Sequence, residues 1–111
     1  MASAAVKAID AKAIDKETRI MRITKEQLTD AEAEKRGIPS WPIWEHPDGR
    51  LDWYYEQTEQ CWFLDGKVTV VEAGEQTVTI GPKDFVTFPE GLRCVWIIHE
   101  PVRKHYTFVS G

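Results

Sequence analysis

The chain has 111 residues, which predicts one domain, and its five Trp, three Tyr and four Phe can fill one modest core. The net charge of −4 provides no basic face for phosphates, and no apolar run approaches the ~20 residues of a membrane span, so neither nucleic acid nor membrane is expected as a partner. Two cysteines and the lack of an apolar leader argue against a secreted disulfide framework and predict a cytoplasmic location.

The N-terminal residues 1–17 predict a flexible tail, and residues 18–111 predict a single domain. Ile9 and Ile14 lie five positions apart, which gives no helical stripe, and a short isolated helix is weak in water. We expect the domain to begin with a strand over Thr18–Ile23.

A helix is predicted next, because Thr24 and Gln27 have the spacing of a capping box. Residues from Gln27 to Arg36 favour helix by intrinsic propensity. Gly37 is a natural helix stop, and Pro39 prevents continuation. The few apolar residues of this segment predict a helix on the surface of the domain.

From Arg50 onward, β signals recur about every eight to twelve residues, which predicts an all-β barrel or sandwich. The expected strands are Leu51–Tyr55, Gln60–Leu64, Lys67–Glu72, Gln76–Ile80, Asp84–Phe88, Arg93–His99 and Lys104–Val109. Turn residues separate them at Asp65-Gly66, Ala73-Gly74, Gly81-Pro82 and Pro89-Glu90-Gly91.

Two short segments combine a polar residue with a turn at fixed spacing. Glu59 precedes Gly66 by seven positions, and Cys94 follows the Pro89-x-Gly91 corner by three. These spacings resemble the two-part motif of the cupins, in which Glu precedes Gly and Pro-x-Gly precedes a His. The resemblance implies an all-β cupin (RmlC-like jelly-roll) barrel with a short N-terminal strand and helix.

A wider set of segments resembles the small single-domain cupins of the ureidoglycine aminohydrolase-like family. They are Ser40–Trp44, Asp52–Tyr55, Phe88–Cys94 and Glu100–Tyr106. Membership would imply aminohydrolase-like chemistry and, as is common among small cupins, a homodimer.

The customary metal ligands of a cupin are three His and one Glu, and here only Glu59 matches. Trp53 and Tyr55 stand at two of the His positions, or Asp52 and Tyr54 in the other allowed register, and Cys94 stands at the third. We therefore predict no bound metal cofactor. Two alternatives stay open, a divalent ion held by Glu59, Cys61 and Cys94, or a disulfide between the two cysteines.

Strand side chains alternate between two faces, so an inward Glu59 predicts inward Cys61 and Phe63. By the same parity, an inward Cys94 predicts an inward Trp96. The expected ligand-binding residues are Trp53, Tyr55, Cys61, Phe63 and Trp96, and the candidate catalytic residues are Glu59 and Cys94. In the last strand, either Arg103 with His105 or Lys104 with Tyr106 enters the cavity, and parity alone does not decide between these pairs.

These features favour binding of a small organic molecule in the barrel cavity, because one polar anchor among aromatics is a common pocket lining. The alternative is a divergent cupin enzyme, aminohydrolase-like or isomerase-like, that uses Glu59 and Cys94 in acid–base or metal-assisted chemistry. A third class is a scaffold whose dimer surface is its function.

Overall fold

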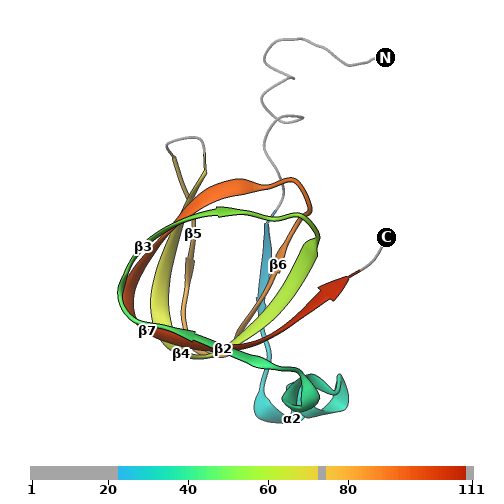
Figure 1. Ribbon diagram of the computed structural model, residues 1–111. Helices are drawn as coiled ribbons and strands as arrows, with labels where there is room; N and C mark the ends of the chain where they lie inside the picture. The colour runs from blue at the N-terminus through green and yellow to red at the C-terminus, as the bar shows by residue number, and fades with distance from the viewer. Residues whose placement is uncertain (1–22, 73–74, 110–111) are drawn as a thin grey trace, which may run out of the picture.

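The structure is a computed structural model that describes residues 23–72 and 75–109 (Figure 1). The predicted tail, the predicted strand up to residue 22 and the predicted turn at residues 73–74 lie outside these residues. The elements are β1 (Thr24–Gln27), α2 (Asp30–Lys35), the 3₁₀ helix η1 (Ile38–Ser40), β2 (Ile43–His46), β3 (Gly49–Tyr54), β4 (Thr58–Glu72), β5 (Glu75–Ile80), β6 (Asp84–Phe88) and β7 (Arg93–Val109).

The strands form one antiparallel sheet that curls into a barrel, as Figure 1 shows. Its centre is the long pair β4 and β7, which stay hydrogen-bonded from Thr58↔Val109 to Val71↔Val95. At one end of this pair, β6 and β1 extend the sheet from β4 and β2 extends it from β7. At the other end, β5 pairs with β4 and β3 pairs with β7. The prediction of an all-β barrel is confirmed.

The long strands replace four shorter predicted ones, because the chain bends without turning at Asp65-Gly66. The register between β4 and β7 shifts at three places between Phe63 and Val68, and such bulges bend a strand while most of its ladder persists. Gly66 has φ +109°, and a Cβ there would lie 2.7 Å from the carbonyl oxygen of Pro101. The predicted turn was therefore wrong, and the glycine instead permits a close crossing of β4 and β7.

The predicted helix start at Thr24 was also wrong. Residues Thr24–Gln27 form β1, which pairs with β6. The capping box lies five residues later, where Thr29 Oγ1 accepts from the Glu32 amide at 3.1 Å and Glu32 accepts from the Thr29 amide at 2.8 Å. Both segments have a capping-box pattern, and pairing with β6 decides that the first is a strand. The helix stop at Gly37 is confirmed by its φ of +75°.

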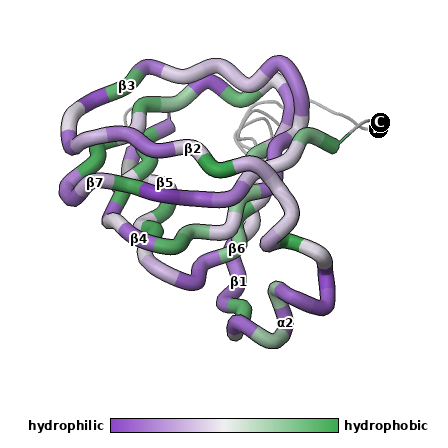
Figure 2. Tube along the Cα trace, turned by 60° about the horizontal axis from the view of Figure 1, so that its bottom comes forward, coloured by the Kyte–Doolittle hydropathy of each residue, from purple (hydrophilic) through white to green (hydrophobic). Residues whose placement is uncertain are grey.

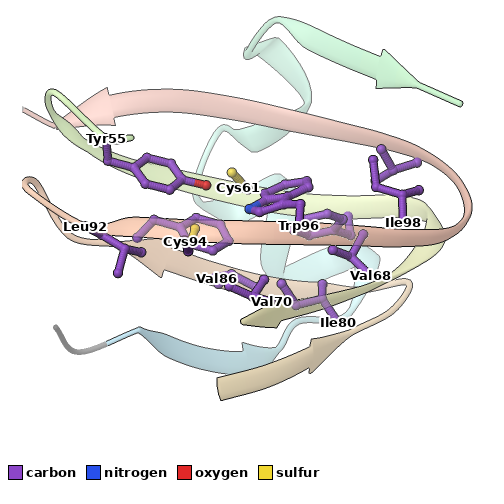
Figure 3. Packing of buried hydrophobic residues seen from close by; sticks show 13 residues of the cluster. Tyr55, Cys61, Val68, Val70, Ile80, Val86, Leu92, Cys94, Trp96 and Ile98 are labelled. Carbon is purple, nitrogen blue, oxygen red and sulfur yellow. The ribbon is translucent and has the colours of Figure 1, made fainter. Parts of the chain in front are cut away.

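The buried side chains form two clusters, one on each side of the strands. The inner cluster fills the barrel and is drawn in Figure 3. The outer cluster lies under α2 and η1 and contains Leu28, Ala33, Ile38, Trp62 and Phe85. Accordingly, the strands carry both hydrophobic and hydrophilic positions rather than long hydrophobic runs (Figure 2). No helix in the described ranges is long and apolar enough to cross a bilayer.

Candidate functional site

The inner face of β4 carries the residues that strand parity predicted. Glu59, Cys61 and Phe63 are 4%, 0% and 0% exposed, and the last two belong to the barrel cluster. Trp62, between them in sequence, belongs to the outer cluster. The alternation is therefore confirmed, and it places a carboxylate and a thiol inside the barrel.

Lys104 on β7 is the partner of both groups. Its side chain is buried, and its Nζ donates to Glu59 Oε2 at 2.6 Å and to Cys61 Sγ at 3.0 Å. The Cys61 thiol in turn donates to the same Glu59 oxygen at 3.1 Å. Lys104, Glu59 and Cys61 thus form a closed triangle of contacts, which we call the buried triad.

The protonation of each group in the buried triad depends on burial and on its neighbours. Burial alone would lower the pKa of the Lys104 ammonium, but the neighbouring Cys61 and Glu59 outweigh burial and raise it. Burial raises the pKa of Cys61 as well, so its thiol stays protonated at neutral pH. The triad therefore presents an ammonium, a neutral thiol and a paired carboxylate oxygen.

Aromatic rings surround the Lys104 ammonium. Its Nζ lies 5.1 Å from the ring centroid of Trp44, 5.2 Å from that of Trp96 and 5.7 Å from that of Tyr106. Cation–π attraction at such distances is strongest where water is excluded, as it is here. The rings hold the ammonium at a fixed position inside the barrel.

A pocket of about 160 Å³ opens over two members of the triad. Glu59 and Lys104 form its polar part, and its aromatic walls are Trp44, Trp53, Tyr106 and Phe108. Phe108 is 52% exposed, which places the solvent-accessible rim at the end of β7. A small molecule entering here would meet both charged groups.

Two further polar atoms are buried next to this region. Tyr55 Oη and Trp96 Nε1 have no hydrogen-bond partner among the described residues, although both side chains are 2% exposed. Figure 3 shows the Tyr55 hydroxyl pointing toward the Trp96 nitrogen and the Cys61 sulfur. The Tyr55 oxygen can accept from the Trp96 N–H, an interaction that acts to lower the pKa of Tyr55, so only the Tyr55 hydroxyl hydrogen calls for a further acceptor.

The other predicted site residues divide into two groups. Trp53, Tyr55, Phe63 and Trp96 pack inside the barrel, whereas Asp52 and Tyr54 are exposed, so the alternative register is wrong. Cys94 is buried in the barrel, but no hydrogen bond joins it to Glu59 among the residues described. Both cysteines are free, so they do not form the disulfide considered above.

The donor set does not fit the metal centre that cupins commonly carry. Within residues 23–72 and 75–109, no three His, Cys, Asp or Glu side chains gather to hold an ion, so Glu59, Cys61 and Cys94 do not form one centre. Glu59 Oε2 already contacts the Lys104 ammonium and the Cys61 thiol. The cation beside the carboxylate is therefore a lysine side chain.

Lys104 is the site residue that sequence reasoning left undecided. The register places Lys104 inward opposite Phe63, while the neighbouring His105 lies opposite Trp62 and contacts the Trp41 carbonyl oxygen on the outer side. A carboxylate predicted inside an apolar barrel requires a buried cation or a proton, which points to a basic residue of this strand but does not choose between Arg103 and Lys104. In the structure, Lys104 is the residue of β7 that supplies this cation to Glu59.

Comparison with known proteins supports the fold and gives the family. The family model of the EutQ-like cupin domain matches residues 33–106. A DUF861 family protein from Thermotoga maritima is 41% identical with a TM-score of 0.75, covering 79% of this chain and 100% of that one. The EutQ protein of Clostridium difficile is 16% identical with a TM-score of 0.55, covering 78% of this chain and 66% of that one.

A putative ethanolamine utilization protein Q from Salmonella typhimurium is 18% identical with a TM-score of 0.54, covering 78% of this chain and 68% of that one. At such low identities, the two EutQ structures support the fold alone. The comparison with curated proteins gives no match. The family model covers most of the barrel, from Ala33 in α2 to Tyr106 in β7. The chain therefore belongs to the family of EutQ-like cupin domains.

Proposed function

We propose that this cupin binds a small organic molecule in the pocket above Glu59 and Lys104. The observation that carries the proposal is a carboxylate and an ammonium, 2.6 Å apart, at the polar part of a pocket with aromatic walls. Concave sites of this kind, mostly apolar with a few convergent polar groups, are the usual form of a small-molecule site.

The paired charges favour a ligand without net charge. Glu59 and Lys104 already neutralise one another, so a charged ligand would leave one buried charge in excess. A group with an N–H for Glu59 and a carbonyl oxygen for Lys104 satisfies both, and a planar group can stack on Trp44 or Trp53. Amides and ureides have this chemistry, which agrees with the resemblance to the ureidoglycine aminohydrolase-like cupins.

The size of the pocket limits the ligand. A volume of 160 Å³ corresponds to roughly five water molecules at ~30 Å³ each. This is less than the ~300 Å³ at which typical drug-sized sites begin. We therefore propose a compact ligand with few non-hydrogen atoms.

Calorimetric titration with four small probes tests the proposal. Hydantoin and acetamide represent the uncharged planar class, and acetate and methylammonium represent the two charged classes. We expect the uncharged probes to bind and Lys104→Met to weaken their binding at least tenfold, which corresponds to loss of ~1.4 kcal/mol.

Arg103→Met is the matched control, because Arg103 is the preceding residue on β7 and its side chain instead pairs with Glu45 outside the pocket. Its affinity should equal that of the unchanged protein. Equal binding by Lys104→Met and the unchanged protein, or binding of the charged probes alone, would contradict the proposed site.

A second candidate is an aminohydrolase-like enzyme that uses the triad for proton transfer. It is favoured by one carboxylate oxygen that contacts both an ammonium and a thiol inside a pocket, since clustered buried titratable groups are typical of active sites. Cys61, rather than the predicted Cys94, is the cysteine that contacts Glu59. Release of ammonia from a ureide, lost in Glu59→Gln but kept in Arg103→Met, would support this candidate over simple binding.

Homodimer formation and cytoplasmic location remain predictions. Support for a dimer comes from a shallow hollow of about 630 Å³ on the outer face of β3, β7 and β4, where Val71, Val95 and Ile97 are only half-buried. Light scattering should give twice the mass of the chain, and Ile97→Lys should reduce it to a monomer. A monomer at high protein concentration would rule out the dimer.

A further inference from the structure

We propose that Cys61 and Lys104 form a modification site, at which peroxide joins Sγ to Nζ in a covalent sulfenamide bond. The two atoms are 3.0 Å apart in a buried contact. This inference goes beyond ligand binding, and it requires no ligand.

The strands hold the two reacting side chains in place. Cys61 pairs with Tyr106 and Lys104 with Phe63 in the continuous ladder of β4 and β7. Cys61 is 0% exposed and Lys104 is 3% exposed, so both side chains are packed within the barrel. A bond between Sγ and Nζ therefore needs only a small approach of two atoms that already touch.

In the proposed reaction, peroxide approaches through the pocket, whose lining includes Lys104 but not Cys61, and it reaches Sγ when the barrel opens locally. Lys104 and Glu59 line the pocket of about 160 Å³, and Cys61 contacts both of them without lining it. Hydrogen peroxide has two non-hydrogen atoms and carries donors and acceptors that match the polar end of the pocket. The proposed oxidant is therefore a small hydroperoxide, because larger oxidants would not fit in the pocket.

In the first step, Glu59 Oε2 accepts the Cys61 thiol proton across their 3.1 Å contact. The sulfur attacks one peroxide oxygen, an S–O bond forms, and the O–O bond breaks. The leaving hydroxide takes this proton back from Glu59 and departs as water, so Glu59 is again a carboxylate. Sulfur is oxidised to a sulfenic acid, and the peroxide is reduced.

In the second step, Lys104 gives one proton to Glu59 across their 2.6 Å contact and becomes a neutral amine. Nζ then attacks Sγ, the S–N bond forms, and the S–O bond breaks with loss of a second water. In sum, a thiol, an ammonium and one peroxide give a sulfenamide, two waters and one proton. Condensation of sulfenic acids with nitrogen is known for backbone amides, and here an amine nitrogen lies 3.0 Å from the sulfur.

An available donor lies near the place where the sulfenic oxygen would form. Figure 3 shows the Tyr55 hydroxyl directed toward the Trp96 nitrogen, with the Cys61 sulfur nearby. The Trp96 N–H can donate to the Tyr55 oxygen, which leaves the Tyr55 hydroxyl hydrogen free to donate to the sulfenic oxygen. A hydrogen bond from the Tyr55 hydroxyl to the sulfenic oxygen would help the oxygen leave in the second step.

The bond would change the pocket as well as the pair. Nitrogen in a sulfenamide carries no ammonium charge, so Glu59 would lose its cation at 2.6 Å. A ligand that accepts a hydrogen bond from Lys104 would lose that donor. Oxidation would therefore close the proposed binding site reversibly, because thiols reduce S–N bonds.

Mass spectrometry of the peroxide-treated full chain tests the proposal. We expect a mass lower by two hydrogen atoms, a missed tryptic cleavage at Lys104, and a linked peptide that contains Cys61. Treatment with a thiol should restore the original mass. Lys104→Met is the first control and should give no link, and the chain unfolded in urea is the second, because the contact is then lost.

Peptide mapping separates the proposal from its competitors even if Lys104→Met does not fold. A linked peptide pair that joins Cys61 to Cys94 would be a disulfide and would overturn the proposal. A link between Cys61 and Lys104 that forms in Cys94→Ala but retains an oxygen atom would overturn it too, because the proposed S–N bond contains no oxygen. A stable sulfenic acid without any link would overturn it too. Ligand binding is measured on the reduced protein, so failure of the link leaves the binding test unaffected.

Discussion

The two sides of β4 and β7 handle their buried polar groups differently. On the outer side, Trp62 Nε1 donates to the Lys83 carbonyl oxygen at 3.2 Å, and His105 Nδ1 lies 2.9 Å from the Trp41 carbonyl oxygen. On the inner side, Glu59 and Lys104 are bonded to side chains, and Tyr55 has no partner among the described residues.

This difference separates structure from proposed function. The outer groups are tied to backbone oxygens of surrounding segments, which fixes η1 and the loop before β6 on the barrel. The inner groups are hydrogen-bonded to one another, and some of their donors and acceptors stay available for a ligand. Polar groups that a core does not need are expected at sites that are kept for function.

Breaking the ion pair on the inner side should give the largest effect. Lys104→Met leaves Glu59 in the barrel without its cation, and removing one member of a buried pair costs about 3–5 kcal/mol. Glu59→Gln should also be destabilising, because it leaves the Lys104 ammonium in the barrel without its carboxylate. Urea unfolding of each variant measures the free energy of unfolding directly.

The double variant Glu59→Gln/Lys104→Met sharpens this result. It removes both charges at similar volume, so it should recover most of the lost stability through a coupling of at least ~2 kcal/mol. Arg103→Met, which loses an exposed ion pair, should change stability by less than ~1 kcal/mol. Additive single effects would show that the pair does not act as a unit.

On the outer side, Trp62→Ala should cost about 3 kcal/mol, because it removes a large buried ring and the donor to Lys83. The ring is 5% exposed and stacks on His105 at a centroid distance of 6.4 Å. Thermal unfolding measures the loss. Titration of the same variant with hydantoin at a temperature where it is folded should give unchanged affinity, and a large change would mean that the two sides are not independent.

Alkaline pH should act mainly on the inner side. Burial raises the pKa of Cys94 from 9.0 to about 12, and it also raises the pKa values of Cys61 and Tyr55. Above pH 9 the unfolded chain therefore releases protons that the folded chain keeps, and stability falls as pH rises. Each such group contributes a slope of up to ~1.4 kcal/mol per pH unit.

Lys104 acts in the same direction, because its folded pKa lies above 10.5 and the stability from its charge is lost as pH rises through that folded value. Unfolding in urea between pH 8 and 10.5 measures the slope from the cysteines and Tyr55, and the loss from Lys104 adds to it only above this range. Cys61→Ala removes one group and should have a shallower slope than the unchanged protein. A stability that is flat across this range would contradict the burial of these groups in the barrel.

The smallest effect concerns the helix that covers the outer side. Thr29→Ala removes the cap of α2 and should cost about 1 kcal/mol. Thr24→Ala, at the capping box that the sequence also offered, should cost less, because Thr24 lies exposed in β1. Thermal unfolding of the two variants decides which threonine caps the helix, and a larger loss for Thr24→Ala would contradict α2 beginning after Thr29.

Local sequence spacing determined the barrel and one side of its site. Glu59-x-Cys61-x-Phe63 alternates about a strand, and the Pro89-x-Gly91 corner lies where β6 ends and β7 follows. These features are local, because strand parity and turn chemistry depend on neighbouring residues. Membership in the cupins followed from the same residues.

Only the tertiary structure decided the remainder. β1 is a strand because β6 pairs with it, and Asp65-Gly66 is a bend because β7 crosses close to it at Pro101. Lys104 rather than Arg103 enters the barrel because the register opposite β4 sets its face, 45 residues from Glu59. Each of these depends on contacts between segments distant in the chain, which local propensity and parity do not specify.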